Sequence, residues 1–171
     1  MLKFDPMKKH IIFILLLVLT VACDTQKEPI VFFVRHAEKD SFTPKDPSLS
    51  IDGVMRSVDL QKWFEGKQID SILSTNTKRT LETAVPLAKA QGKEIGIYEP
   101  MNFEAFAIAI KALKADTIVI IGHSNTILPQ IEALGITKPQ EAIGENEYNK
   151  LFQVNLSEKT AEVHLFGSDS K

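Results

Sequence analysis

The chain has 171 residues, a formal net charge of −2, and a composition that is 44% hydrophobic and 25% charged. This length is close to that of a single domain, and the composition excludes a disordered or collagen-like protein. The nearly balanced charge favours no nucleic-acid partner. The single cysteine, Cys23, excludes an internal disulfide and a zinc site made of several cysteines.

Residues 1–22 have the pattern of a signal peptide. Lysines at positions 3, 8 and 9 precede an apolar run that extends from Ile11 to Ala22. A membrane-spanning helix needs about 20 apolar residues, so this run is too short to span a bilayer and has the length of a signal-peptide core. Met7 is an alternative start to Met1.

The segment Leu19–Cys23 resembles the lipobox of bacterial lipoproteins, although Thr20 stands where Leu or Val is usual. We therefore predict a lipoprotein-type signal peptide over 1–22, a short tether over 23–28 and a folded domain over 29–167. Lipid on Cys23 would anchor the protein in the bacterial cell envelope, facing the periplasm or the exterior. Two alternatives stay open, a secretory signal with an incidental cysteine and an uncleaved anchor.

The first half of the domain has alternating strand and helix patterns. Ile30–Val34 is a continuous apolar run, which is typical of a strand buried on both faces. Ser50 is the expected N-cap of a helix that ends near Gly66. A second strand is predicted at Ser71–Ser74.

The next helix is predicted from Lys78 to about Ala90. Thr77 is its expected N-cap and Gly92 its stop. Pro86 lies inside this segment and predicts a kink or a split in the helix, because proline lacks the N–H of the helical hydrogen bond.

The second half repeats the alternation and ends on two strands. The strongest strand pattern is Thr117–Ile121, and a turn around residues 157–159 joins the last two strands as a hairpin. The remaining predictions are a strand at 94–98, a helix capped by Asn102 that extends to 113, a helix opened by 124–126 that extends to about 134, and hairpin strands at 151–155 and 161–165. This order predicts a three-layer α/β/α fold with a mostly parallel central sheet and a C-terminal β-hairpin.

Four polar residues follow the predicted strands, at the edge of the sheet where ligands bind in such folds. Arg35 and His36 come directly after the first strand, Arg79 opens the helix after the second, and His123 follows the strongest strand. Guanidinium groups bind phosphate oxygens, and a neutral imidazole is a competent nucleophile near neutral pH. The pattern therefore predicts phosphoryl transfer without a metal or other cofactor, on a small phosphorylated substrate.

Each of these residues also has a simpler interpretation. Arg79 has Glu82 one turn further along the same helix and could serve only in that ion pair. His123 could be a structural histidine at a strand end. We expect the remaining histidine of the domain, His164, to be structural or on the surface because it falls inside the last strand.

Four sequence blocks resemble the histidine phosphatase superfamily, the phosphoglycerate mutase-like proteins, in the order that family has them. They are Val34–Lys39, Leu49–Gly53 with Arg56, Ser74–Ala84 and Gly122–Ser124. The resemblance implies that His36 is the phosphorylated nucleophile, that Arg35, Arg79 and His123 bind the phosphate, and that no metal is needed. The resemblance also implies that His123 is a catalytic residue together with His36.

The resemblance is weaker at the acid that protonates the leaving group. Many members supply this acid after the third strand, and Glu99 is the candidate at that position here. The domain is too short for the inserted segments of the sugar-phosphate mutases, so the chain is identified as a short, lipoprotein-type member. We expect an acid phosphatase-like phosphomonoesterase rather than a mutase. The alternatives are a non-catalytic envelope lipoprotein that binds a phospho-ligand, and a structural envelope protein.

Overall fold

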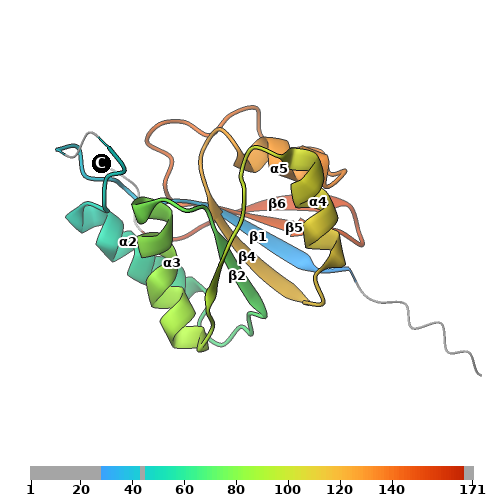
Figure 1. Ribbon diagram of the computed structural model, residues 1–171, viewed down its shortest axis with the longest axis horizontal. Coiled ribbons are helices and arrows are strands. Elements are labelled where there is room, and N and C mark those ends of the chain that lie inside the picture. Colours follow the sequence, from blue (N-terminus) through green and yellow to red (C-terminus); the bar gives the residue numbers. More distant parts are fainter. Residues whose placement is uncertain (1–27, 43–44, 168–171) are drawn as a thin grey trace, which may run out of the picture.

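The computed structural model describes residues 28–42 and 45–167 (Figure 1). The predicted signal peptide, Cys23 and nearly all of the tether lie outside these residues. Six strands form one sheet in the order β3-β2-β4-β1-β5-β6. The strands are β1 (Ile30–Arg35), β2 (Ser71–Ser74), β3 (Ile95–Ile97), β4 (Thr117–Gly122), β5 (Lys150–Asn155) and β6 (Thr160–Leu165).

The sheet is mostly parallel, as predicted. Strand β1 pairs in parallel with β4, and β4 and β3 both pair in parallel with β2. Strand β5 runs antiparallel to β1, and β6 runs antiparallel to β5, which is the predicted hairpin. The carboxyl ends of β1, β2 and β4 therefore meet at one edge, so the residues that follow them lie close together.

Helices pack against both faces of the sheet (Figure 1). Successive side chains of β1 point to opposite faces, so Val31 and Phe33 pack in a cluster with helices α4 and α5, and Phe32 and Val34 pack with α2 and α3. The helices are α2 (Ile51–Trp63), α3 (Lys78–Gln91), α4 (Phe103–Ala112) and α5 (Ile127–Ala133). Because both faces of β1 are buried, this strand is a continuous apolar run.

Two predicted helix caps are present. The Ser50 hydroxyl accepts a hydrogen bond from the Gly53 N–H at 3.1 Å, and the Asn102 side-chain oxygen accepts one from the Ala105 N–H at 3.1 Å. Gly92 ends α3 with a φ of 61°, a left-handed conformation that glycine adopts without a steric penalty. Among the described residues, no helix is both long enough and apolar enough to cross a bilayer.

Three helix details differ from the expectations. Helix α3 is not split at Pro86, because the burial of its apolar side, which includes Leu87 and Ala88, outweighs the lost hydrogen bond. Thr77 is the N-cap residue of α3, as predicted, but its hydroxyl makes no cap hydrogen bond and lies 2.8 Å from the Thr80 hydroxyl. Helix α5 begins at Ile127, so residues 124–126 form a turn before it rather than its first turn.

Candidate active site

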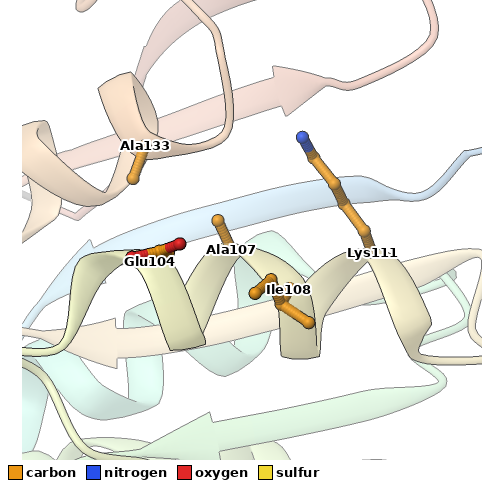
Figure 2. Close-up of a pocket in the computed structure, with 5 residues that line it drawn as sticks. All are labelled: Glu104, Ala107, Ile108, Lys111 and Ala133. Carbon is orange, nitrogen blue, oxygen red and sulfur yellow. The ribbon is translucent and has the colours of Figure 1, made fainter.

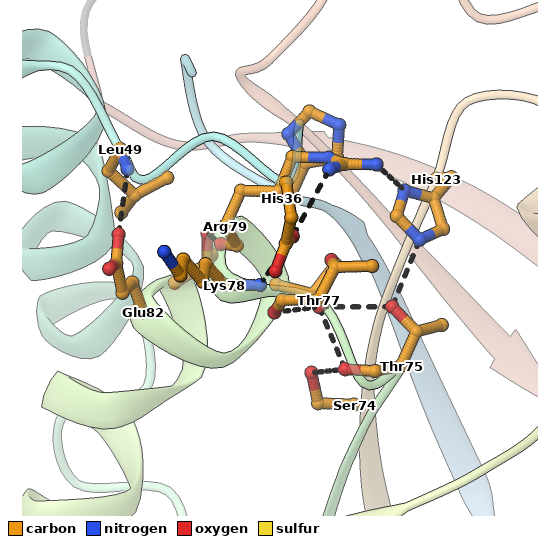
Figure 3. Close-up of polar contacts among 12 residues, drawn as sticks. His36, Leu49, Ser74, Thr75, Thr77, Lys78, Arg79, Glu82 and His123 are labelled. Atoms are coloured by element: carbon orange, nitrogen blue, oxygen red, sulfur yellow. Dashed lines mark hydrogen bonds and ion pairs between the residues drawn. The ribbon is translucent and has the colours of Figure 1, made fainter. Parts of the chain in front are cut away.

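The four predicted residues come together at the carboxyl edge of the sheet. Arg35 ends β1 and pairs in register with Gly122, the last residue of β4, so His36 and His123 are neighbours. Their ring centroids are 5.4 Å apart at an angle of 65°. Strand β2 lies beside β4, and the turn after it brings Arg79 to His123 (Figure 3).

His36 is buried and has one defined tautomer. Its Nδ1 lies 2.8 Å from the Ala37 carbonyl oxygen, and because a carbonyl only accepts, Nδ1 carries the proton. The Nε2 atom is therefore left with a free lone pair. Burial and, to a smaller extent, the positive charges of Arg79 and Arg35 together lower the pKa of His36 to about 3. The ring is neutral near pH 7, which is the form that acts as a nucleophile.

His123 lies between a hydroxyl and a guanidinium. Its Nε2 is 2.9 Å from the Thr75 hydroxyl oxygen, and its Nδ1 is 3.5 Å from Nη2 of Arg79 (Figure 3). Burial lowers the pKa of His123 to about 4, with contributions from Arg79 and Arg35. A phosphate dianion in the site would offset these positive charges and favour the protonated ring.

Arg79 does not pair with Glu82. Its Nη1 lies 3.8 Å from a carboxylate oxygen of Asp46, while Glu82 accepts a hydrogen bond from the Leu49 N–H at 2.7 Å. The simple helix pairing that the sequence allowed is therefore wrong. The Arg79 side chain is only 21% exposed and points toward His123 (Figure 3), so its charge acts on the histidine pair.

Arg35 has partners that the sequence did not predict. Its Nη1 donates to the carbonyl oxygens of Gly144 and Glu145, each at 2.8 Å, and its Nη2 donates to the Tyr148 hydroxyl at 3.3 Å. Its Nε is buried and has no partner. Burial lowers the pKa of the guanidinium, which still stays charged near neutrality. Arg35 thus ties the loop before β5 to the site, and its Nε remains available to an anion.

Two residues of the second sequence block hold the segment after His36. Arg56 binds the Glu38 carboxylate through two nitrogens, with distances of 2.6 and 2.8 Å. A Cβ on Gly53 would overlap the Glu38 carbonyl oxygen, so only glycine allows α2 to approach this closely. This block therefore fixes the backbone after the histidine.

Glu99 is exposed at the rim of a pocket of about 480 Å³ that His123 also lines. Its carboxylate accepts a hydrogen bond from the Met101 N–H at 3.4 Å. The two residues on either side of Glu99 are fixed by the buried Gln130, which donates to the Pro100 carbonyl at 3.1 Å and accepts from the Tyr98 hydroxyl at 3.5 Å. The position of Glu99 is thus anchored, although its side chain reaches into solvent.

A second hollow lies between α4 and α5 and has other lining residues than the pocket beside Glu99 (Figure 2). It measures about 400 Å³ and is lined by Glu104, Ala107, Ile108, Lys111 and Ala133. None of the predicted site residues lines it. His164 is also away from the site, on β6, where its Nε2 lies 3.0 Å from the Gln153 side-chain oxygen, as expected for a structural histidine. Within 28–42 and 45–167, no three histidine or acidic side chains are grouped to hold a metal ion.

Comparisons with known proteins find one matching family model. The family model of the histidine phosphatase superfamily (branch 1) matches residues 31–102. No curated protein has a significant match to the sequence.

Solved structures share the fold at low sequence identity. The protein histidine phosphatase SixA, solved with tungstate, has a TM-score of 0.64 and 15% identity over 82% of this chain and 97% of its own. Phosphoserine phosphatase of Entamoeba histolytica, solved with 3-phosphoglyceric acid, has a TM-score of 0.59 and 15% identity over 82% and 97%. A mycobacterial glucosyl-3-phosphoglycerate phosphatase, solved with inorganic phosphate, has a TM-score of 0.58 and 14% identity over 83% and 98%.

Proposed function

We propose that this chain, which belongs to the histidine phosphatase superfamily, hydrolyses a phosphate ester through a phosphohistidine at His36. The observation that carries the proposal is the fixed tautomer of His36. Its Nδ1 proton is held by the Ala37 carbonyl, so the free lone pair of Nε2 belongs to a neutral ring beside two arginines and a second histidine.

The first step transfers the phosphoryl group to the enzyme. The Nε2 lone pair of His36 attacks phosphorus, a P–N bond forms, and the bond between phosphorus and the ester oxygen breaks. Arg79, the free Nε of Arg35 and a protonated His123 would bind the non-bridging oxygens, where charge develops. The leaving oxygen needs a proton, and Glu99 is our candidate to give it from its carboxylic acid form.

Water completes the reaction. It attacks phosphorus and breaks the P–N bond, which releases inorganic phosphate and returns His36 to its neutral form. The water loses a proton to Glu99, which is thereby ready to act as an acid again. The arginines supply the positive charge that a metal ion supplies in other phosphatases, so we propose that the reaction needs no metal.

The substrate that fits is a small phosphorylated molecule. The pocket beside His123 measures about 480 Å³, and the related structures were solved with 3-phosphoglyceric acid, inorganic phosphate or tungstate. We propose hydrolysis rather than mutase chemistry, because the short domain leaves a pocket open to water. The finer assignment as an acid phosphatase-like phosphomonoesterase rests on the same openness.

We also propose that the protein is a lipoprotein of the bacterial cell envelope, attached through Cys23. The support is the sequence pattern alone, the apolar run from Ile11 to Ala22 followed directly by the cysteine. The described domain begins a few residues later, so such an anchor would keep it near the membrane surface.

The decisive experiment traps the phosphoenzyme. Rapid quenching with a labelled phosphate ester is expected to give an acid-labile, base-stable phosphoprotein, mapped to the peptide that contains His36. His36→Ala should abolish both the label and phosphate release, because removing a member of a catalytic unit typically costs several orders of magnitude. His164→Ala is the matched control and should retain both. A label on His123, or ligand binding without any phosphate release, would contradict the proposal.

A further inference from the structure

We propose that Thr75, supported by Thr80, is the positioning residue that fixes the ring and the tautomer of His123. The inference deepens the proposed function and rests on it in one respect, namely that His123 is a phosphate ligand. Thr75 is the first residue after β2 and is only 2% exposed, and Thr80 is fully buried in the first turn of α3.

The direction of the hydrogen bonds follows from the chemistry of Arg79. A guanidinium only donates, so the Nδ1 atom of His123, at 3.5 Å from Nη2 of Arg79, must accept. The proton of the neutral ring is therefore on Nε2. This N–H donates to the Thr75 hydroxyl oxygen at 2.9 Å (Figure 3).

The Thr75 hydroxyl continues the chain of hydrogen bonds in the same direction. Having accepted from His123, it donates its own proton to the Thr80 hydroxyl oxygen at 3.0 Å. Thr80 in turn donates to a backbone carbonyl, with those of Thr75 and Thr77 both at 2.9 Å. The hydroxyls of Thr75 and Thr80 thus each accept a hydrogen bond and donate one. With Arg79 on one side of the ring and this chain on the other, all of these groups are satisfied only when the His123 proton is on Nε2.

This arrangement prepares His123 for an anion. The free lone pair of Nδ1 lies on the Arg79 side of the ring, where the phosphate is proposed to bind. When a phosphate oxygen arrives, Nδ1 takes up a proton from solvent and donates a hydrogen bond to that oxygen, while the Nε2 proton stays on the ring and still donates to Thr75. Without the hydroxyl, the buried Nε2–H would have no acceptor, a cost that opposes the preference set by Arg79 and allows the other tautomer to form.

The test reads the tautomer directly. In the purified protein with labelled histidine, nitrogen NMR is expected to show His123 protonated on Nε2 only. Thr75→Val, which has nearly the same shape, should give a mixture of tautomers and weaken the binding of inorganic phosphate by about tenfold, the effect of one lost hydrogen bond. Thr75→Ser should restore both measurements.

The control is Ser57→Ala, which removes another buried hydroxyl, one that donates to the Val54 carbonyl within α2. It should leave the tautomer and phosphate affinity unchanged. A wild-type His123 protonated on Nδ1 would overturn the proposal, even if Thr75→Val failed to fold. So would a folded Thr75→Val variant with Nε2–H only and unchanged affinity. These measurements need no turnover, so failure of the proposed phosphatase activity would be seen separately, as the absence of phosphate release.

Discussion

The guanidinium carbon of Arg35 lies 4.0 Å from the centroid of the Tyr148 ring, across a separation of 113 residues in the sequence. The ring face and the hydroxyl both contact the guanidinium, and the Gly144 and Glu145 carbonyls occupy Nη1. The arginine is thus oriented before any ligand arrives, which reduces the side-chain entropy lost on binding. Its buried Nε has no partner, and it is the atom that we propose for a phosphate oxygen.

Loss of the Arg79 charge should impair catalysis. Arg79→Ala is expected to lower kcat/KM by a factor that corresponds to about 2–4 kcal/mol of lost transition-state stabilisation, as when an oxyanion-hole donor is removed. Lys78→Ala removes an exposed positive charge next to it and is the matched control. Steady-state kinetics with one ester decide the matter, and equal effects of the two substitutions would contradict a specific role for Arg79.

Glu99 can be tested through the leaving group. Nitrophenolate leaves without a proton, whereas an alkoxide needs one. Glu99→Gln should therefore slow formation of the phosphoenzyme from an alkyl phosphate by about 100-fold or more and change its formation from nitrophenyl phosphate little. Glu104→Gln, at an exposed acid on α4, is the control. An equal loss on both esters would remove Glu99 from the role of acid.

Acidification should destabilise the ligand-free protein. The pKa values of His36 and His123 are lowered to about 3 and about 4 in the folded state, below the ordinary 6.5. As the pH falls below about 6.5, the unfolded chain takes up protons that the folded chain does not, so the free energy of unfolding decreases. Urea unfolding at about pH 7 and about pH 5 measures this change.

The same measurement on variants identifies the source of the pH dependence. His36→Ala should lose less stability than wild type between the two pH values, and His164→Ala should behave as wild type. Inorganic phosphate should reduce the loss, because an anion favours protonated His123. A His36→Ala variant with the full wild-type pH dependence would show that this histidine is not the cause.

Activity should persist in excess EDTA. The positive charge of the proposed site comes from Arg35, Arg79 and His123, so chelation removes nothing that binds the phosphate. Phosphate release is compared with and without chelator after extensive dialysis. Complete loss, with recovery on adding a divalent ion, would mean that the reaction depends on a metal.

Cys23→Ser should release the protein from membranes. Without the thiol no lipid can be attached, and the remaining apolar run is too short to span a bilayer. Fractionation of cells that express either form is the measurement. If the Cys23→Ser protein stays in the membrane fraction at full length, the uncleaved run is the anchor instead.

The strands and the four site residues were predictable because both depend on local pattern. A strand buried on both faces is a continuous apolar run, as at β1 and β4, and the polar residues that follow such runs must lie at one edge of a parallel sheet. His36 and His123 were placed together on this basis, and the structure has them in contact.

The contacts that tune the site were not predictable, because they join distant segments. Arg35 binds carbonyls more than a hundred residues away. Every residue has a backbone carbonyl, so the sequence does not indicate which ones bind the arginine. The sequence does not distinguish Thr75 from the other threonines, because only the pairing of β2 with β4 places its hydroxyl against His123. Pro86 was misleading for the opposite reason, since packing on α3 outweighs its local effect.

The central position of β1 dictates the order in which the site can form. Its neighbours in the sheet are β4 and β5, which end at Gly122 and Asn155. A growing chain that contains His36 therefore has no partner for β1 until β4 is complete at residue 122 of 171, and lacks the second partner until β5 is complete at residue 155. Pairings of such long range form slowly. In any fragment that ends before β4, the strand that precedes His36 therefore lacks both of its neighbours in the sheet.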